Sequence, residues 1–93
     1  MGRMRKLQTA PGAAGDILVE LRHLHLRAGE PSMRAIARLT GAISHDTVHR
    51  ILTGPDVPQW APLELVVEAL HGDVELFREL WITARSAMDE DRA

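Results

Sequence analysis

Residues 33–54 read MRAIARLTGAISHDTVHRILTG and decide the fold, because two short helical patterns meet there at a turn. The first helix is predicted to begin at Ser32 and to end at Gly41, since serine favours N-caps and glycine favours helix C-termini. Its inward positions are Ile36 and Ala37, with either Thr40 or Leu39 completing the stripe. Arg34 and Arg38 fall on the other side of this helix.

The second helix of this stretch has Ser44 as its candidate N-cap and stops at Gly54 and Pro55. Its inward stripe is narrow and has the spacing i, i+3, i+4: Val48, Ile51 and Leu52. The opposite face, at 100° per residue, is polar and contains no aliphatic residue: Asp46, His49, Arg50 and Thr53, with His45 at its edge. A polar face on a short helix is usually only solvated, so its surroundings have to decide its use.

Upstream of this stretch, residues 1–15 lack a period and are predicted to form a flexible basic tail. A helix is predicted over residues 16–28, with Asp16 as N-cap and Gly29 after its end. Its apolar positions recur at helical spacing: Ile17, Leu18, Leu21 and Leu24.

Downstream, TGPDVPQWAP (residues 53–62) reads as a stiff loop because it holds three prolines and a glycine. A fourth helix is defined by Leu63, Val66, Val67 and Leu70 and is closed by His71 and Gly72. A fifth follows the candidate cap Asp73, and its apolar face is Phe77, Leu80, Trp81, Ala84 and Met88. Trp60 is expected to pack the loop against these two helices, and Trp81 to lie in the core or in a dimer core.

The pattern as a whole predicts an all-α domain of five helices over residues 16–88, followed by an acidic tail at residues 89–93. No strand pattern occurs in the sequence. Cysteine is absent, which leaves no disulfide or thiolate metal site, and no apolar run approaches the ~20 residues of a membrane span. We therefore expect a cytoplasmic protein that does not enter a membrane.

Charge is distributed unevenly along the chain, although the net charge is only −2. Residues 1–54 carry eight Lys or Arg against four Asp or Glu, and residues 55–93 carry three against nine. A basic half beside an acidic half is typical of a nucleic-acid face backed by a face that is solvated or meets protein. Ordinary scatter of surface charge is the competing interpretation.

The pair His45 and His49, with Asp46 between them, resembles a shortened zinc-protease helix. Asp46 is one methylene shorter than the glutamate of that motif, and the sequence marks no third ligand, whereas a catalytic zinc needs three protein ligands and a water. We therefore expect no metal site, no other cofactor and no enzymatic activity.

The stretch at residues 33–54 resembles the helix-turn-helix of Cro/C1-type (Xre-like) DNA-binding domains, and VPQWAPLELVVEALHGDVELFRELW resembles the continuation seen in actinobacterial members. The resemblance covers about residues 16–85 and implies a lambda-repressor-like fold whose second and third helices form the motif. The turn between Gly41 and Val48 is one residue longer than the shortest family pattern, with Ile43 filling it.

This resemblance implies roles for individual residues. The third helix would enter the major groove of double-stranded DNA, with base contacts from Ser44, His45, Asp46, His49 and Arg50. The DNA backbone would be contacted by Ser32, Met33, Arg34, Arg38 and Thr53. Asp46 has an equally weighted second interpretation, because an acid in the first turn is favoured by the helix dipole.

The predicted function is therefore sequence-specific DNA binding by a transcriptional regulator, with a homodimer expected on two half-sites. The alternative from another class is a protein-interaction module, similar to an antitoxin, whose acidic fourth and fifth helices dock a protein partner.

Overall fold

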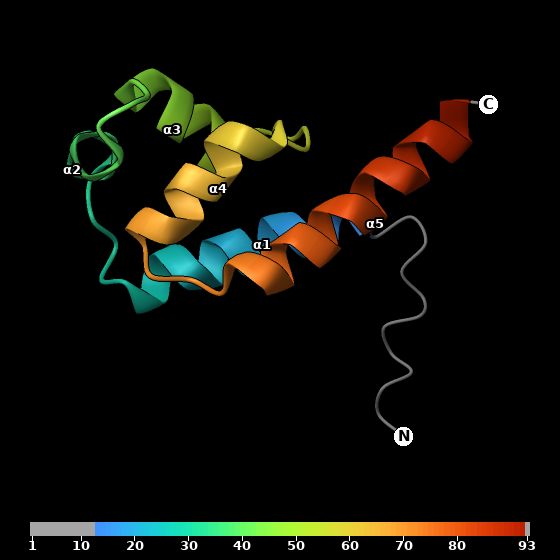
Figure 1. Ribbon diagram of the computed structural model, residues 1–93, viewed down its shortest axis with the longest axis horizontal. Coiled ribbons are helices and arrows are strands. Elements are labelled where there is room, and N and C mark those ends of the chain that lie inside the picture. The colour runs from blue at the N-terminus through green and yellow to red at the C-terminus, as the bar shows by residue number, and fades with distance from the viewer. Residues whose placement is uncertain (1–12, 93) are drawn as a thin grey trace.

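The computed structural model describes residues 13–92, and the side chains of residues 15–88, as five helices (Figure 1). They are α1 (Ala13–Arg27), α2 (Met33–Thr40), α3 (His45–Thr53), α4 (Trp60–Ala69) and α5 (Val74–Arg92). Over the described range no strand is present, and the all-α prediction is confirmed there. Residues 1–12 of the predicted basic tail lie outside the described residues.

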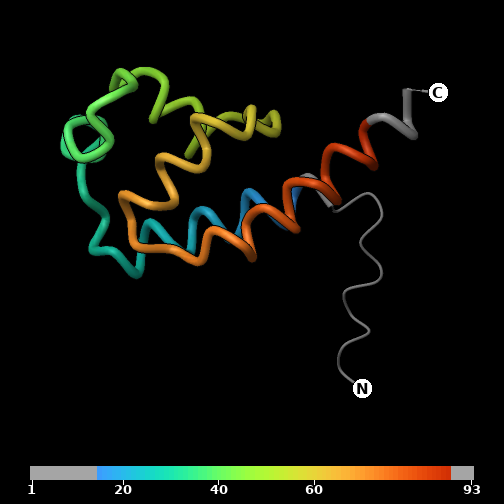
Figure 2. The backbone as a smooth tube through the Cα atoms, viewed as in Figure 1, coloured from blue at the N-terminus to red at the C-terminus, as the bar shows by residue number. Residues whose placement is uncertain are grey.

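Two layers make up the domain. Helices α1 and α5 run side by side in opposite directions, and α5 continues beyond the start of α1 (Figures 1 and 2). Helices α2, α3 and α4 form the other layer, in which α2 packs on both α3 and α4. Helix α4 also packs on α5, so it joins the two layers.

The core lies between these layers and is drawn from all five helices. Its buried members are aliphatic apart from one phenylalanine: Ile17, Leu21, Leu24, Ile36, Val48, Ile51, Leu52, Val57, Leu63, Val66, Val67, Leu70, Phe77 and Ala84. No polar or charged residue is buried among the described side chains. The predicted inward stripes of the helices therefore meet in one core, which Val57 joins from the loop.

The predicted start of α1 is wrong. The helix begins at Ala13 and not at Asp16, which lies in the first turn. Alanine is the best helix former, and an acid stabilises the first turn through the helix dipole without capping it. The predicted end is close: Arg27 is the last helical residue, and Gly29 follows with a φ of +90°.

Helix α4 begins earlier than predicted, because its first turn includes Trp60 and Pro62, which we expected in the loop. Proline fits there, since the amides of the first turn have no partner within the helix and a missing N–H costs nothing. The first intrahelical bond runs from the Leu63 amide to the Gln59 carbonyl (3.3 Å).

The link between α4 and α5 confirms the predicted stop and start. His71 adopts a φ of +61°, and the Gly72 amide donates to the Val67 carbonyl at 2.8 Å, which closes α4. Asp73 then caps α5, because its Oδ1 accepts from the Leu76 amide at 3.1 Å. Helix α5 continues to Arg92, so residues 89–92 are helical and do not form a separate tail as predicted.

The two tryptophans pack on each other at the junction of α4, α5 and the preceding loop. Their ring centroids lie 5.8 Å apart, and Trp81 Nε1 donates to the Pro58 carbonyl at 2.8 Å. Trp60 packs on α5 as predicted, but it does so from the first turn of α4 and not from the loop. Trp81 is only half-buried against the core, because the edge of its ring that carries Nε1 faces the loop and donates to Pro58.

Candidate nucleic-acid interface

Helix α2 is held at both ends by the residues predicted to do so. Ser32 Oγ accepts from the Ala35 amide at 3.0 Å, and Gly41 closes the helix at a φ of +67°. Ile36 is buried, whereas Arg34 and Arg38 are exposed. Of the two residues left open for the inward stripe, Thr40 is the half-buried one and Leu39 is 66% exposed.

The turn between α2 and α3 is organised by one hydroxyl. Thr40 Oγ1 donates to the Ala37 carbonyl at 2.8 Å and accepts from the amides of Ala42 (3.2 Å) and Ile43 (3.4 Å). Ile43 packs against the core. The residues that lengthen the turn are therefore fixed by hydrogen bonds and burial, and they set the position at which α3 begins.

Helix α3 presents the predicted pair of faces. Val48, Ile51 and Leu52 are buried, and the outer residues Asp46, His49, Arg50 and Thr53 are exposed. Ser44 caps the helix by accepting from the Thr47 amide at 3.2 Å, and its Oγ lies 3.2 Å from Thr47 Oγ1. The cap uses Ser44 as an acceptor, so its hydroxyl hydrogen stays available to a ligand or to Thr47.

His45 and Asp46 contact each other at the N-terminal end of α3. His45 Nε2 lies 3.4 Å from Asp46 Oδ1, with side chains 43% and 81% exposed. Such an exposed contact contributes little to stability. The contact places the His45 ring, a hydrogen-bond donor, beside the Asp46 carboxylate, an acceptor. The donor is complementary to purine N7, and the acceptor is complementary to the amino group at cytosine N4.

The Thr53 side chain, which we predicted to contact the DNA backbone, is already hydrogen-bonded within α3. Its Oγ1 donates to the His49 carbonyl at 2.7 Å and lies 3.4 Å from His49 Nδ1. The hydroxyl hydrogen is therefore engaged within α3, and a phosphate would have to displace it. Met33 is half-buried and packs against the core, so of the predicted backbone contacts Ser32, Arg34 and Arg38 have the more open side chains.

The structure adds two residues of α1 to this surface. Arg22 and His25 line a hollow of about 230 Å³ together with Met33, Leu52 and Thr53, between the start of α2 and the end of α3. His25 Nε2 donates to the Pro31 carbonyl at 2.9 Å, which ties α1 to the residue before the α2 cap. Sequence reasoning missed Arg22, because its proximity to α2 and α3 depends on how α1 packs.

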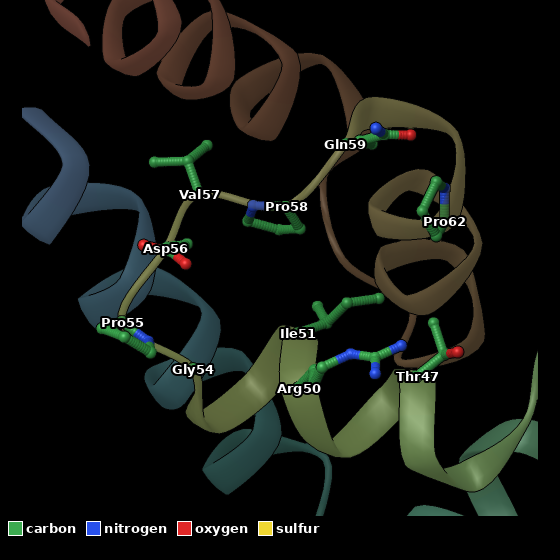
Figure 3. A pocket seen from close by; sticks show the side chains of 10 residues that line it. All are labelled: Thr47, Arg50, Ile51, Gly54, Pro55, Asp56, Val57, Pro58, Gln59 and Pro62. Carbon is green, nitrogen blue, oxygen red and sulfur yellow. The ribbon is translucent and has the colours of Figure 1, made fainter.

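Arg50 lies beside a second hollow, of about 330 Å³, between α3, residues 54–59 and the first turn of α4 (Figure 3). The Arg50 side chain runs along the α3 edge of this hollow, with Pro62 of α4 across from it (Figure 3). No carboxylate among the described side chains lies within ion-pair distance of its guanidinium. The guanidinium is thus exposed and free to pair with an external acceptor.

The charge imbalance of the sequence is clearest between α2 and α4. Helix α2 carries two exposed arginines and no acidic residue, whereas α4 carries Glu64 and Glu68 and no basic residue. In the described part of α5, Glu75 and Glu79 are exposed. The arginines of α2 therefore lie on a different helix from the glutamates of α4, whereas α3 and the described part of α5 carry charges of both signs: Asp46 and Arg50 on α3, and Glu75, Arg78, Glu79 and Arg85 on α5.

Within residues 15–88, no group of three or more His, Cys, Asp or Glu side chains is placed to hold a metal ion. His45 and His49 provide two ligands on one face of α3, which is fewer than a zinc site requires. None of the helices of residues 13–92 combines the length and apolar character that crossing a bilayer requires.

Comparisons of the chain with protein-family models, with curated proteins and with solved structures found no match.

Proposed function

We propose that this chain binds double-stranded DNA in a sequence-specific manner and acts as a transcriptional regulator of the Xre-like class in the cytoplasm. The observation that carries the proposal is the outer face of α3. This face is polar and exposed along its length, and it stands on a buried stripe formed by Val48, Ile51 and Leu52. A helix of this kind, preceded by a capped helix with exposed arginines, supports its assignment as a recognition helix.

The contacts divide by chemistry. Arg50 can donate two hydrogen bonds to guanine O6 and N7, Asp46 can accept from cytosine N4, and His45 can donate to a purine N7. Ser44 at the N-cap of α3 and His49 on its outer face are both exposed. Ser32, Arg34 and Arg38 at α2, with Arg22 of α1, are the proposed phosphate contacts, and Met33 and Thr53 border them.

A single α3 covers only a few base pairs, so we propose a homodimer whose two copies read half-sites about one helical turn apart. The resulting operator would be a near-palindrome.

Selection of bound duplexes from a random DNA pool tests the proposal, followed by a salt titration on the selected duplex. We expect one enriched motif and a log–log salt slope of about 0.9 per phosphate contacted. Failure to enrich any duplex, or binding that does not respond to salt, would contradict DNA binding.

One observation favours a second candidate function, a protein-interaction module that docks a partner on α4 and α5. Helix α5 exposes Leu76 (46%) between Glu75 and Glu79, and it exposes Ile82 (43%) further along the helix. A basic partner with apolar side chains would complement such a surface. The same selection experiment separates the two candidates, since this second function predicts no enriched duplex.

A further inference from the structure

The hollow beside Arg50 has the dimensions and the lining of a small-molecule site. Its volume of about 330 Å³ lies at the lower end of the range of roughly 300–1,000 Å³ that such sites occupy. Its walls are mainly apolar, from Ile51 of α3, Val57 of the loop and Pro62 of α4. Polar groups are few and lie along the edges (Figure 3).

Three prolines and two hydrogen bonds restrain the walls of the hollow. Prolines at positions 55, 58 and 62 line the hollow, and each fixes its own φ. The loop is tied to α5 by the bond from Trp81 to the Pro58 carbonyl, and Gly54 is bound to α3 through the Arg50 carbonyl at 2.8 Å. A Cβ at Gly54 would lie 2.6 Å from that oxygen, so glycine fits this C-cap position of α3 where a residue with a side chain would have to shift. A preformed site loses little free energy to ordering when it binds.

The polar edge offers a ligand one positively charged donor, Arg50 of α3. Arg50 is a permanently charged fork of donors without an ion-pair partner among the described side chains, and Thr47 adds a hydroxyl on the same side of the hollow. Asp56 lines the loop side and lies beyond ion-pair distance of Arg50. A carboxylate is the group that a guanidinium fork recognises bidentately, and the apolar walls accept a hydrocarbon body.

We propose that this hollow binds a small organic acid with an apolar body, its carboxylate on Arg50 and its body against Ile51, Val57 and Pro62. A consequence, which rests on the proposed function, is that the acid and DNA compete for the Arg50 guanidinium. One fork cannot pair with a ligand carboxylate and with guanine at the same time, so the acid lowers the affinity for the operator. The hollow is then an effector site that shares Arg50 with the proposed DNA-binding surface.

The first experiment tests the site without DNA. The full ¹⁵N-labelled chain is titrated with cyclohexanecarboxylate and with its neutral isostere cyclohexanecarboxamide, and the amide signals of Gly54, Val57 and Gln59 are followed. We expect the carboxylate to shift these signals and to bind about tenfold more tightly than the carboxamide. Arg50→Gln should abolish this preference. Arg27→Gln, which removes an exposed arginine at the end of α1, is the matched control and should retain it.

Absence of shifts at these amides, equal binding of the two compounds, or an unchanged preference in Arg50→Gln would overturn the site. The second experiment adds the selected duplex. Saturating carboxylate should weaken DNA binding, and carboxamide at the same concentration should not. Unchanged DNA affinity in saturating carboxylate would overturn the competition alone. If no duplex is bound at all, the proposed function fails together with the competition, and the first experiment still decides the acid site.

Discussion

The indole N–H of Trp81 donates to the carbonyl oxygen of Pro58 at 2.8 Å, which ties helix α5 to the loop that follows α3. Trp60 packs on the same ring at 5.8 Å, and the guanidinium of Arg85 lies 5.7 Å from the Trp81 ring centroid. The loop that follows the candidate recognition helix is thus held by a residue 23 positions further along the sequence.

Replacing Trp81 measures this link. Trp81→Ala should lower the free energy of unfolding by about 3 kcal/mol, the lower end for large aromatics because the side chain is only half-buried. Trp81→Phe keeps a ring and loses the hydrogen bond, so its cost should be about 1 kcal/mol. Urea denaturation of the three proteins gives both values. Equal stability of Trp81→Ala and the parent would show that α5 is not anchored at this position.

In the link between α4 and α5, substitutions at the adjacent positions 71 and 72 should change the stability of the protein in opposite directions. His71 has a φ of +61°, a conformation that costs an L-residue with a side chain roughly 1–2 kcal/mol, so His71→Gly should raise stability by up to about 1 kcal/mol. His71→Ala is the control and should bring no such gain. Thermal melting compares them, and a destabilised glycine variant would contradict the argument.

Gly72→Ala should destabilise the protein. A Cβ there would lie 2.6 Å from Leu24 Cδ2 and 3.0 Å from Val67 Cγ1, and both side chains are buried and cannot move away freely. Overpacking of this kind costs about 1–3 kcal/mol. A urea melt that overlays the parent curve would mean that the core relaxes around the added methyl group.

Ser44 combines a cap with a candidate base contact, and two variants separate these roles. Ser44→Ala should cost about 1 kcal/mol of stability because the Thr47 amide loses its acceptor. Ser44→Asp restores a cap of similar strength and adds a negative charge at the proposed DNA surface. Its stability should match the parent while DNA binding weakens. Parental DNA affinity in Ser44→Asp would place the start of α3 away from the duplex.

Replacing Arg50 and replacing Arg34 should weaken DNA binding in different ways. Arg50→Ala should cost about 1–3 kcal/mol of binding free energy and relax the preference at one base pair per half-site. Arg34→Ala should weaken all sequences alike and lower the salt slope by about one. Repeated selection and salt titration of each variant measure these effects. If the Arg50→Ala protein selects the parental motif at every position, α3 is oriented differently from our proposal.

The two histidines of α3 should act through DNA and not through a metal. His45→Ala and His49→Ala are expected to reduce operator binding, and treatment of the parent protein with a chelator is expected to leave it unchanged. Metal analysis of protein purified without a metal column provides the check. Stoichiometric zinc that is lost on chelation together with DNA binding would contradict this prediction.

Much of the secondary structure followed from the sequence, because the signals that start and stop helices are local. Ser32, Ser44 and Asp73 bond to amides three residues on, and Gly41 adopts the left-handed conformation that ends α2. The helical spacing of the apolar residues then predicted which face of α3 is buried and which is polar. The misjudged boundaries, at Ala13 and Trp60, are positions where weak first-turn preferences and a tolerated proline give no sharp local signal.

By itself the sequence therefore determined five helices, their inward faces and the polar outer face of α3. Only the tertiary structure decided which residues of distant segments meet. Arg22 lies near the start of α2, Val57 is buried in the core, and Trp81 is hydrogen-bonded to Pro58. These contacts depend on the packing of α1 against α5 and on α4, which joins the two layers. The hollow beside Arg50 arises in the same way, between a helix, a proline-rich loop and the first turn of another helix. Periodicity specifies the direction in which a side chain points along its own helix, whereas its neighbours on other helices are set by packing of the whole core.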